Sequence, residues 1–94
     1  MKQQSVFKAM ADPTRRKILQ ILRAQDSLCA GDIGSHFTIS APAISEHLRI
    51  LLAAGLVRRQ RQGKYIHYHL NTSIFEDIAS YCLQLTDRNK EASE

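Results

Sequence analysis

The chain is short of cysteine and of long apolar runs, and each shortage excludes a class of protein. Its two cysteines, Cys29 and Cys82, lack CxxC spacing and are too few for a disulfide scaffold, so we expect reduced thiols. No stretch approaches the roughly 18–20 apolar residues of a membrane span, and the first residues lack the apolar run of a signal peptide. These absences predict a cytoplasmic protein.

Catalytic patterns are missing as well. The sequence has no nucleophile beside a base, no glycine-rich phosphate loop and no paired carboxylates suited to a cleft. We therefore predict that the protein is not an enzyme, has no small-molecule substrate and uses no cofactor.

Acidic residues are absent from 47–75, although that stretch carries five basic residues. The whole chain has 13 basic and 9 acidic residues and a net charge of +4, so its charges are segregated rather than numerous. A basic stretch with no acid to neutralise it fits a polyanion, and double-stranded DNA fits best.

A helix is predicted from about Ala41 to just before Gly55. Ser40 is a good N-cap because its hydroxyl accepts from an unpaired N–H, and a proline in the first turn loses no hydrogen bond. Gly55 tolerates the left-handed conformation that ends helices. The apolar residues spaced for the core face are Ile44, Leu48, Leu51 and Leu52. The residues expected on the outward face are Pro42, Ser45, Glu46 and Arg49.

After Leu56 the sequence period changes to about two, which predicts two strands joined at Gln62-Gly63. Gly63 supplies the positive φ of a tight reversal. The basic residues at the tip and flanks of this hairpin are Arg58, Arg59, Arg61 and Lys64. A helix, a glycine stop and a basic hairpin indicate a winged helix-turn-helix, mainly α with a small β-hairpin.

The other helices are expected on both sides of this region. A short first helix is followed by a second over about 13–24, which begins with Asp12 as N-cap and a proline at its first position. A third covers Ala30 to Phe37, and the turn 38–40 leads into the helix at Ala41.

The last helix is predicted to start at a capping box, Ser73-Ile74-Phe75-Glu76, and the polar tail from about Asp87 is expected to fray. The 94 residues suit one winged-helix domain, 1–94. A domain this small buries only roughly 60–65% of the surface that its unfolded chain exposes. The long apolar seam of the last helix therefore favours association with a second copy.

Three segments, FKAMADPTRRKILQIL, AGDIGSHFTISAPAISEHLRILLAAGLV and RRQRQGKYIHYHLN, resemble in this order the ArsR family of bacterial winged-helix repressors, particularly its small autorepressors. The resemblance covers about residues 5–85. It implies a homodimer that packs its first and last helices together and presents two reading helices to successive major grooves of an operator. The residues expected at that dimer interface are Val6, Phe7, Met10, Ile74, Phe75, Ile78, Tyr81, Cys82 and Leu85.

The same layout predicts the DNA-binding residues. On the reading helix these are Ser40, Pro42, Ala43, Ser45, Glu46, His47 and Arg49, and in the wing they are Arg59, Arg61, Gln62, Lys64 and Tyr65. His47 is interpreted either as a DNA contact or as a packing residue. Glu46 either accepts from a cytosine or pairs with Arg49, and the pair is favoured. The basic run 15–17 either contacts phosphate or forms a solvated or dimer-edge surface.

Many members of the family sense metals or arsenicals through a cysteine pair in the third helix or through Asp and His ligands on the last helix. Here Cys29 matches one cysteine position, Gly31 stands at the other, and residues 72–94 lack histidine. We therefore expect no metal site. Two minor alternatives remain: Cys29 as a redox switch, and His67 with His69 sharing a cation.

The leading hypothesis is a dimeric, sequence-specific transcriptional repressor, an autorepressor without a metal site. The alternative is a winged-helix protein-interaction module that a protein or membrane partner sequesters. Such a partner could also relieve repression.

Overall fold

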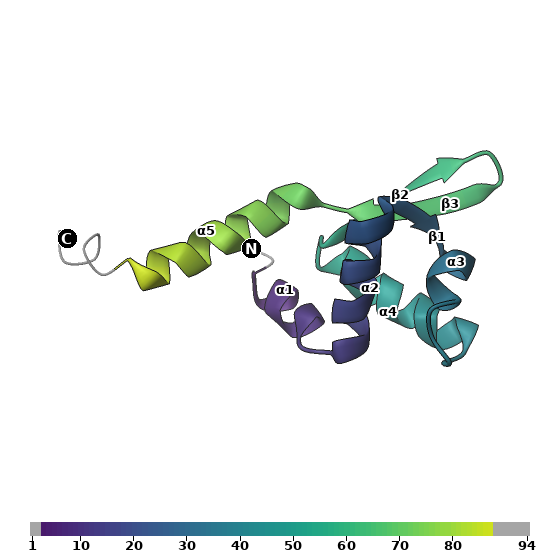
Figure 1. Ribbon diagram of the computed structural model, residues 1–94, viewed down its shortest axis with the longest axis horizontal. Helices are drawn as coiled ribbons and strands as arrows, with labels where there is room; N and C mark the ends of the chain where they lie inside the picture. Colours follow the sequence, from purple (N-terminus) through teal and green to yellow (C-terminus); the bar gives the residue numbers. More distant parts are fainter. Residues whose placement is uncertain (1–2, 88–94) are drawn as a thin grey trace.

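The computed structural model describes residues 3–87, which form five helices and three strands (Figure 1). The elements are α1 (Gln3–Met10), α2 (Pro13–Gln25), β1 (Ser27–Cys29), α3 (Ala30–Gly34), α4 (Ala41–Ala53), β2 (Val57–Gln62), β3 (Tyr65–Leu70) and α5 (Thr72–Thr86). In Figure 1, α1 to α4 form a body from which the β2–β3 hairpin and α5 extend in opposite directions. Between residues 3 and 87 no helix is long and apolar enough to cross a membrane.

The strands form one antiparallel sheet in the order β1-β3-β2. The predicted hairpin is confirmed: Val57 lies opposite Leu70 at its base, Gln62 lies opposite Tyr65 at its tip, and Gly63 turns the chain with a φ of 66°. The prediction of a hairpin alone is wrong, because β1 pairs with β3 as a third strand. With only three residues, β1 is too short to show the alternation that identifies strands in a sequence.

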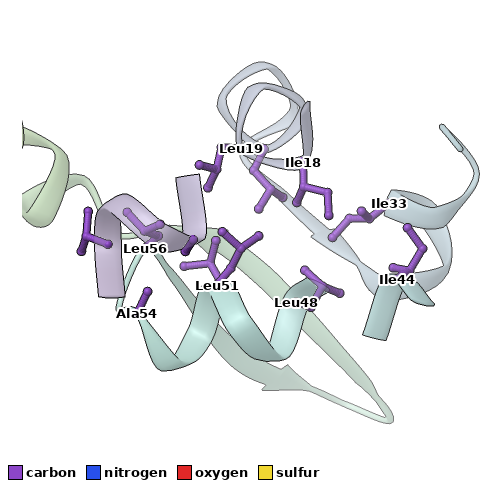
Figure 2. Packing of buried hydrophobic residues seen from close by; sticks show 12 residues of the cluster. Ile18, Leu19, Ile33, Ile44, Leu48, Leu51, Ala54 and Leu56 are labelled. Atoms are coloured by element: carbon purple, nitrogen blue, oxygen red, sulfur yellow. The ribbon is translucent and has the colours of Figure 1, made fainter. Parts of the chain in front are cut away.

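The core lies between α2, α3, α4 and the sheet, as Figure 2 shows. α2 buries an apolar stripe, and three of the four predicted core residues of α4 are fully buried; Leu52 is half-buried against them. The buried side chains of these helices are Ile18, Leu19, Ile21, Leu22, Ile44, Leu48 and Leu51. Because full burial of one such side chain contributes roughly 1.5–3 kcal/mol, this cluster fixes α4 firmly in the body.

α1 divides its apolar residues between two sides. Val6 is 2% exposed and packs with Ala9 in the core, whereas Phe7 is 46% exposed and Met10 is half-buried. Val6 was expected at a dimer interface. Its burial within a single chain corrects that expectation, since its side chain has no surface left for a partner.

The predicted N-caps of the two long body helices are confirmed. The Asp12 carboxylate accepts from the backbone N–H of Arg15 at 3.1 Å, and the Ser40 hydroxyl accepts from that of Ala43 at 3.2 Å. Gly55 follows α4 with a φ of 80°, the left-handed conformation that ends a helix at little cost when the residue is glycine. Both ends of α4 are therefore where the sequence places them.

The predicted end of the third helix is wrong. α3 ends at Gly34, and beyond it the N–H groups of His36 and Phe37 donate to the carbonyls of Ile33 and Gly34, three residues back. Such bonds form tight turns rather than an α-helix, so the connection to α4 is longer than 38–40. Phe37 still packs against the core, with Lys17 Nζ 5.1 Å from its ring centre.

The predicted capping box of the last helix is also wrong. α5 begins at Thr72 with Asn71 as N-cap, so Ser73 lies inside the first turn. The Asn71 side chain donates to the carbonyl of Gly55 at 2.8 Å instead of capping α5, and its backbone N–H donates to that of Leu56 at 3.0 Å. Asn71 thereby fastens the start of α5 to the chain that follows α4.

α5 projects from the body instead of lying along it (Figure 1). Ile74, Phe75 and Ile78 pack partly against the core, yet no residue of α5 is buried. The radius of gyration is 15.5 Å, against about 12 Å for a compact chain of this length. The second half of the helix therefore leaves its apolar side chains in solvent. The predicted fraying of the tail after Asp87 lies outside the described residues.

Candidate nucleic-acid interface

The outward face of α4 is open to solvent along its N-terminal half. Its exposed residues are Ser40, Pro42, Ser45, Glu46 and Arg49, as the sequence predicts, while Ala43 and His47 are half-buried at its margins. The inner face of the same helix is held in the core. A helix fixed on one side and bare on the other has the form that enters the major groove of DNA.

Glu46 and Arg49 form an ion pair on this face. The Arg49 guanidinium donates from Nε to Oε1 of Glu46 at 2.9 Å and from Nη2 to Oε2 at 2.6 Å. This hydrogen bonding holds the pKa of the Glu46 carboxyl below its usual value, because it favours the charged form. Of the two interpretations left open by the sequence, the free chain shows the intrahelical pair.

The hairpin presents an unneutralised cationic surface. Every side chain from Arg58 to Ile66 is exposed, and no ion pair within residues 3–87 involves the cations of the wing. Arg61 Nη1 donates to the carbonyl of Gly63 at 3.4 Å, and Lys64 Nζ lies 5.9 Å from the ring centre of Tyr65. These contacts leave the positive charges available to an external anion.

The strand register places Arg59 and Arg61 on one side of the sheet. Cross-strand partners project to the same side, and Arg59 lies opposite Tyr68 while Arg61 lies opposite Ile66. Both arginines alternate with the buried Val57 and therefore share the core side of the sheet. They extend that side past the core toward the tip.

His67 and His69 project to the other side of the sheet, where their alternation places them together. His69 lies opposite Arg58, and His67 Nδ1 is 3.4 Å from Ser27 Oγ. Cys29, on β1, is the cross-strand partner of His67 on β3. Among residues 3–87 there is no group of three or more His, Cys, Asp or Glu side chains that could hold a metal ion.

Cys29 occupies the N-cap position of α3, but its thiol caps no backbone N–H. Its Sγ instead donates to Asp32 Oδ2 at 3.2 Å. Cys29 is half-buried and Cys82 is exposed on α5, and both are free thiols.

His47 lies at the margin of the α4 face and faces the start of α2. Its Nδ1 is 3.3 Å from Arg15 Nη1 and 3.9 Å from Asp12 Oδ2, and its side chain is 20% exposed. The Arg15 backbone N–H, with the nearby charge of Arg15, holds the pKa of the Asp12 carboxyl below its usual value. The contact with α2 is thus polar, which the sequence alternatives for His47 did not include.

The first two basic residues of α2 contact the end of α1. Arg15 donates to the carbonyls of Ala9 and Lys8 at 2.7 and 3.4 Å, and Arg16 donates to that of Met10 at 2.8 Å. The last carbonyls of a helix lack intrahelical partners and carry partial negative charge, so cations stabilise them. The sequence left the basic run 15–17 as a phosphate contact or as a solvated or dimer-edge surface, and it did not predict this contact with α1.

The helix pair, the exposed reading face and the basic wing define a winged helix-turn-helix regulator, and the chain belongs to the ArsR family. Residues 12–59 match the family described as "Bacterial regulatory protein, arsR family". The protein is accordingly a DNA-binding transcriptional repressor of a family that is not enzymatic.

Individual relatives agree with this assignment. The chain is 46% identical over 84 residues to the transcriptional repressor SdpR of Bacillus subtilis (strain 168), covering 89% of this chain and 92% of that protein. It is 32% identical to an ArsR-like transcriptional regulator from Rhodococcus sp. RHA1, with a TM-score of 0.81 and coverage of 97% and 88%. A crystal structure of another ArsR family transcriptional regulator, 22% identical, has the same fold, with a TM-score of 0.84 and coverage of 93% and 94%.

Proposed function

We propose that the protein is a homodimeric repressor that binds a specific operator without a metal ion or other cofactor. The N-terminal half of α4 contacts base edges in the major groove, and the wing contacts phosphates. The residues assigned to these contacts are Ser40, Pro42, Ala43, Ser45, Glu46, His47 and Arg49 on the reading helix and Arg59, Arg61, Gln62, Lys64 and Tyr65 in the wing.

The combination of a bare α4 face with unpaired wing cations carries this proposal. Ser45 is exposed on the outward face of a helix whose opposite face is held in the core, so its backbone position is fixed. The ion pair of Glu46 with Arg49 neutralises the carboxylate that would otherwise repel phosphate. Positive charge in the wing then supplies the sequence-independent attraction that positions the helix on the duplex.

The exposed apolar surface where α1 and α5 meet supports a homodimer. Phe7 is 46% exposed and Tyr81 is 45% exposed, and their ring centres lie 6.2 Å apart with a tilt of 50°. Leu85, on the same face of α5, is 60% exposed. A monomer rarely leaves such a contiguous apolar surface in water, whereas a two-fold interface buries it twice.

A groove of about 400 Å³ continues this apolar surface between α2 and the start of α5. Its lining residues are Met10, Arg16, Leu19, Gln20, Arg23, Leu70, Thr72 and Phe75. Covering apolar surface contributes roughly 25 cal/mol per Å², so a second copy seated against α1 and α5 would gain affinity here as well.

Operator binding is tested in two steps. Duplexes that the protein binds are first selected from genomic fragments, and their gel mobility is then measured with and without the protein. The resemblance to small autorepressors makes the promoter of the protein's own gene the first expected target. If the protein retarded none of the selected duplexes, the proposal would be contradicted. That result would favour the alternative, a protein-interaction module that a protein or membrane partner sequesters.

Two substitutions separate base contact from phosphate contact. Arg61→Ala should weaken binding to every duplex by a similar factor and lower the salt slope by about one, because one phosphate contact releases about one counterion. Ser45→Ala should cost about 1–3 kcal/mol on the selected operator and much less on random duplex. The assignment of base and phosphate contacts is wrong if, in salt titrations, Arg61→Ala weakens only operator binding and Ser45→Ala weakens binding to every duplex equally.

The absence of a metal site is tested with Zn²⁺ and arsenite. Operator affinity should not change when either is added, because neither ligand set of the family is complete in this sequence. A tenfold or larger loss of affinity that Cys29→Ser or His67→Ala abolishes would contradict this part of the proposal.

A further inference from the structure

Arg15 links three elements through one guanidinium. Its Nε and Nη2 donate to the carbonyls of Ala9 and Lys8 at the end of α1, and its Nη1 lies 3.3 Å from His47 Nδ1 on α4. The side chain is half-buried, and its backbone N–H is held by the Asp12 carboxylate. A guanidinium anchored on α1 in this way has little freedom to leave the histidine ring.

The contact determines which ring nitrogen of His47 carries the proton. A guanidinium has only donors, so a ring nitrogen that accepts from it must be unprotonated. His47 Nδ1 is therefore the acceptor, and the proton of the neutral ring lies on Nε2. The carboxylate of Asp12 would favour a proton on Nδ1, but it lies farther away, at 3.9 Å, and already accepts from the backbone of Arg15.

The remaining ring nitrogen of His47, Nε2, makes no hydrogen bond within residues 3–87. Within residues 3–87, no buried side-chain nitrogen or oxygen lacks a hydrogen-bond partner. His47 Nε2 has no protein partner, since both contacts of the ring are made by Nδ1, and Nε2 is therefore accessible to solvent. It lies at the margin of the exposed α4 face.

We propose that Arg15 is a positioning residue for DNA recognition: it holds His47 as the Nε2–H tautomer and directs that N–H toward an acceptor on the duplex. This inference rests on the proposed function of α4. It goes further because Arg15 lies on α2, outside the helix-turn-helix pair, and acts through His47. The acceptor is a phosphate oxygen or a base-edge acceptor in the major groove.

Nitrogen NMR of His47 in the free, full-length protein tests the tautomer. We expect an unprotonated signal from Nδ1 and a protonated one from Nε2 at neutral pH. Arg15→Ala should abolish this single-tautomer pattern. Arg16→Ala is the matched control, because Arg16 also donates to the end of α1 but does not contact His47. A wild-type spectrum with the proton on Nδ1 would overturn the proposal.

A double-mutant cycle tests the effect on recognition, with the tightest duplex from the genomic selection as the probe. Arg15→Ala and His47→Ala should each weaken binding roughly three- to tenfold, as expected for one hydrogen bond. Beyond the additive loss of one positive charge, which Arg16→Ala measures, the double variant should be no weaker than His47→Ala alone. Arg16→Ala should combine additively with His47→Ala, which measures the loss of one positive charge. Circular dichroism checks that each variant folds. If Arg15→Ala does not fold, Arg15→Lys takes its place in the cycle.

The outcomes separate this inference from the proposed function. Additive losses for Arg15→Ala and His47→Ala, on a wild type that binds, would overturn the inference alone. A wild type that binds none of the selected duplexes would overturn the proposed function and the DNA contact of His47 together.

Discussion

α4 and α5 are amphipathic helices of similar length, 13 and 15 residues, but only α4 uses its apolar face within the chain. α4 buries Ile44, Leu48 and Leu51, whereas α5 buries no residue. The two helices also start differently, because the side chain of Ser40 caps α4 and that of Asn71 leaves α5 uncapped. An apolar stripe in a sequence therefore shows only that a face needs covering, and it does not show whether the cover comes from the same chain.

The largest expected effect comes from truncating a side chain on the buried face of α4. Leu51→Ala should lower the free energy of unfolding by about 2–5 kcal/mol, because it removes a fully buried side chain and leaves a cavity. Leu83→Ala on α5 should change it by no more than about 0.5 kcal/mol, since Leu83 is 68% exposed. Urea unfolding at one fixed chain concentration measures both. Equal losses in the two variants would remove the contrast between the helices.

A smaller expected effect concerns the dimer. Leu85→Asp should raise the dissociation constant of the dimer by about a hundredfold or more, because the charge would be buried twice in a two-fold interface. Leu83→Asp is the matched control: two residues along a helix place the side chain about 160° around the axis, away from the seam. Sedimentation at several concentrations measures the dissociation constant. A wild type that sediments as a monomer at micromolar concentration, or identical behaviour of the two variants, would contradict the dimer.

The smallest expected effect concerns the helix caps of the body. Asp12→Ala and Ser40→Ala should each cost about 1 kcal/mol at pH 7, the usual contribution of an N-cap. Only the first should depend on pH. The folded state lowers the pKa of Asp12 below 3.8, so its extra stability is complete above about pH 4 and is lost as the pH falls through the folded pKa. Denaturant unfolding from pH 7 to pH 3 should show the Asp12→Ala difference shrinking and the Ser40→Ala difference constant.

The parts of the fold that sequence predicts are those determined by local chemistry. The caps Asp12 and Ser40, the glycine stop at Gly55 and the turn at Gly63 each depend on a few adjacent residues, and all are confirmed. The exposed face of α4 follows in the same way from helical spacing. Local patterns were therefore enough to identify the reading helix and the wing.

The missed features depend on partners distant in the sequence. β1 exists because Leu28 and its neighbours pair with β3, and the expected capping box fails because Asn71 already starts α5 and uses its amide on Gly55. The contact between Arg15 and His47 joins residues from different helices, so no spacing rule indicates it. Sequence patterns predicted what each helix exposes, but not which cross-helix contacts orient the exposed groups.

In the proposed dimer, Asn71 helps to set the distance between the two reading helices. Its two hydrogen bonds, to Gly55 and Leu56, form a joint between the chain that follows the reading helix and the start of α5. If two copies meet through α5, the gap between their reading helices is a length fixed at this joint, and it must match the roughly 34 Å repeat of the double helix. An agent that loosened the joint would mis-space the two arms and release DNA without touching any residue that contacts it.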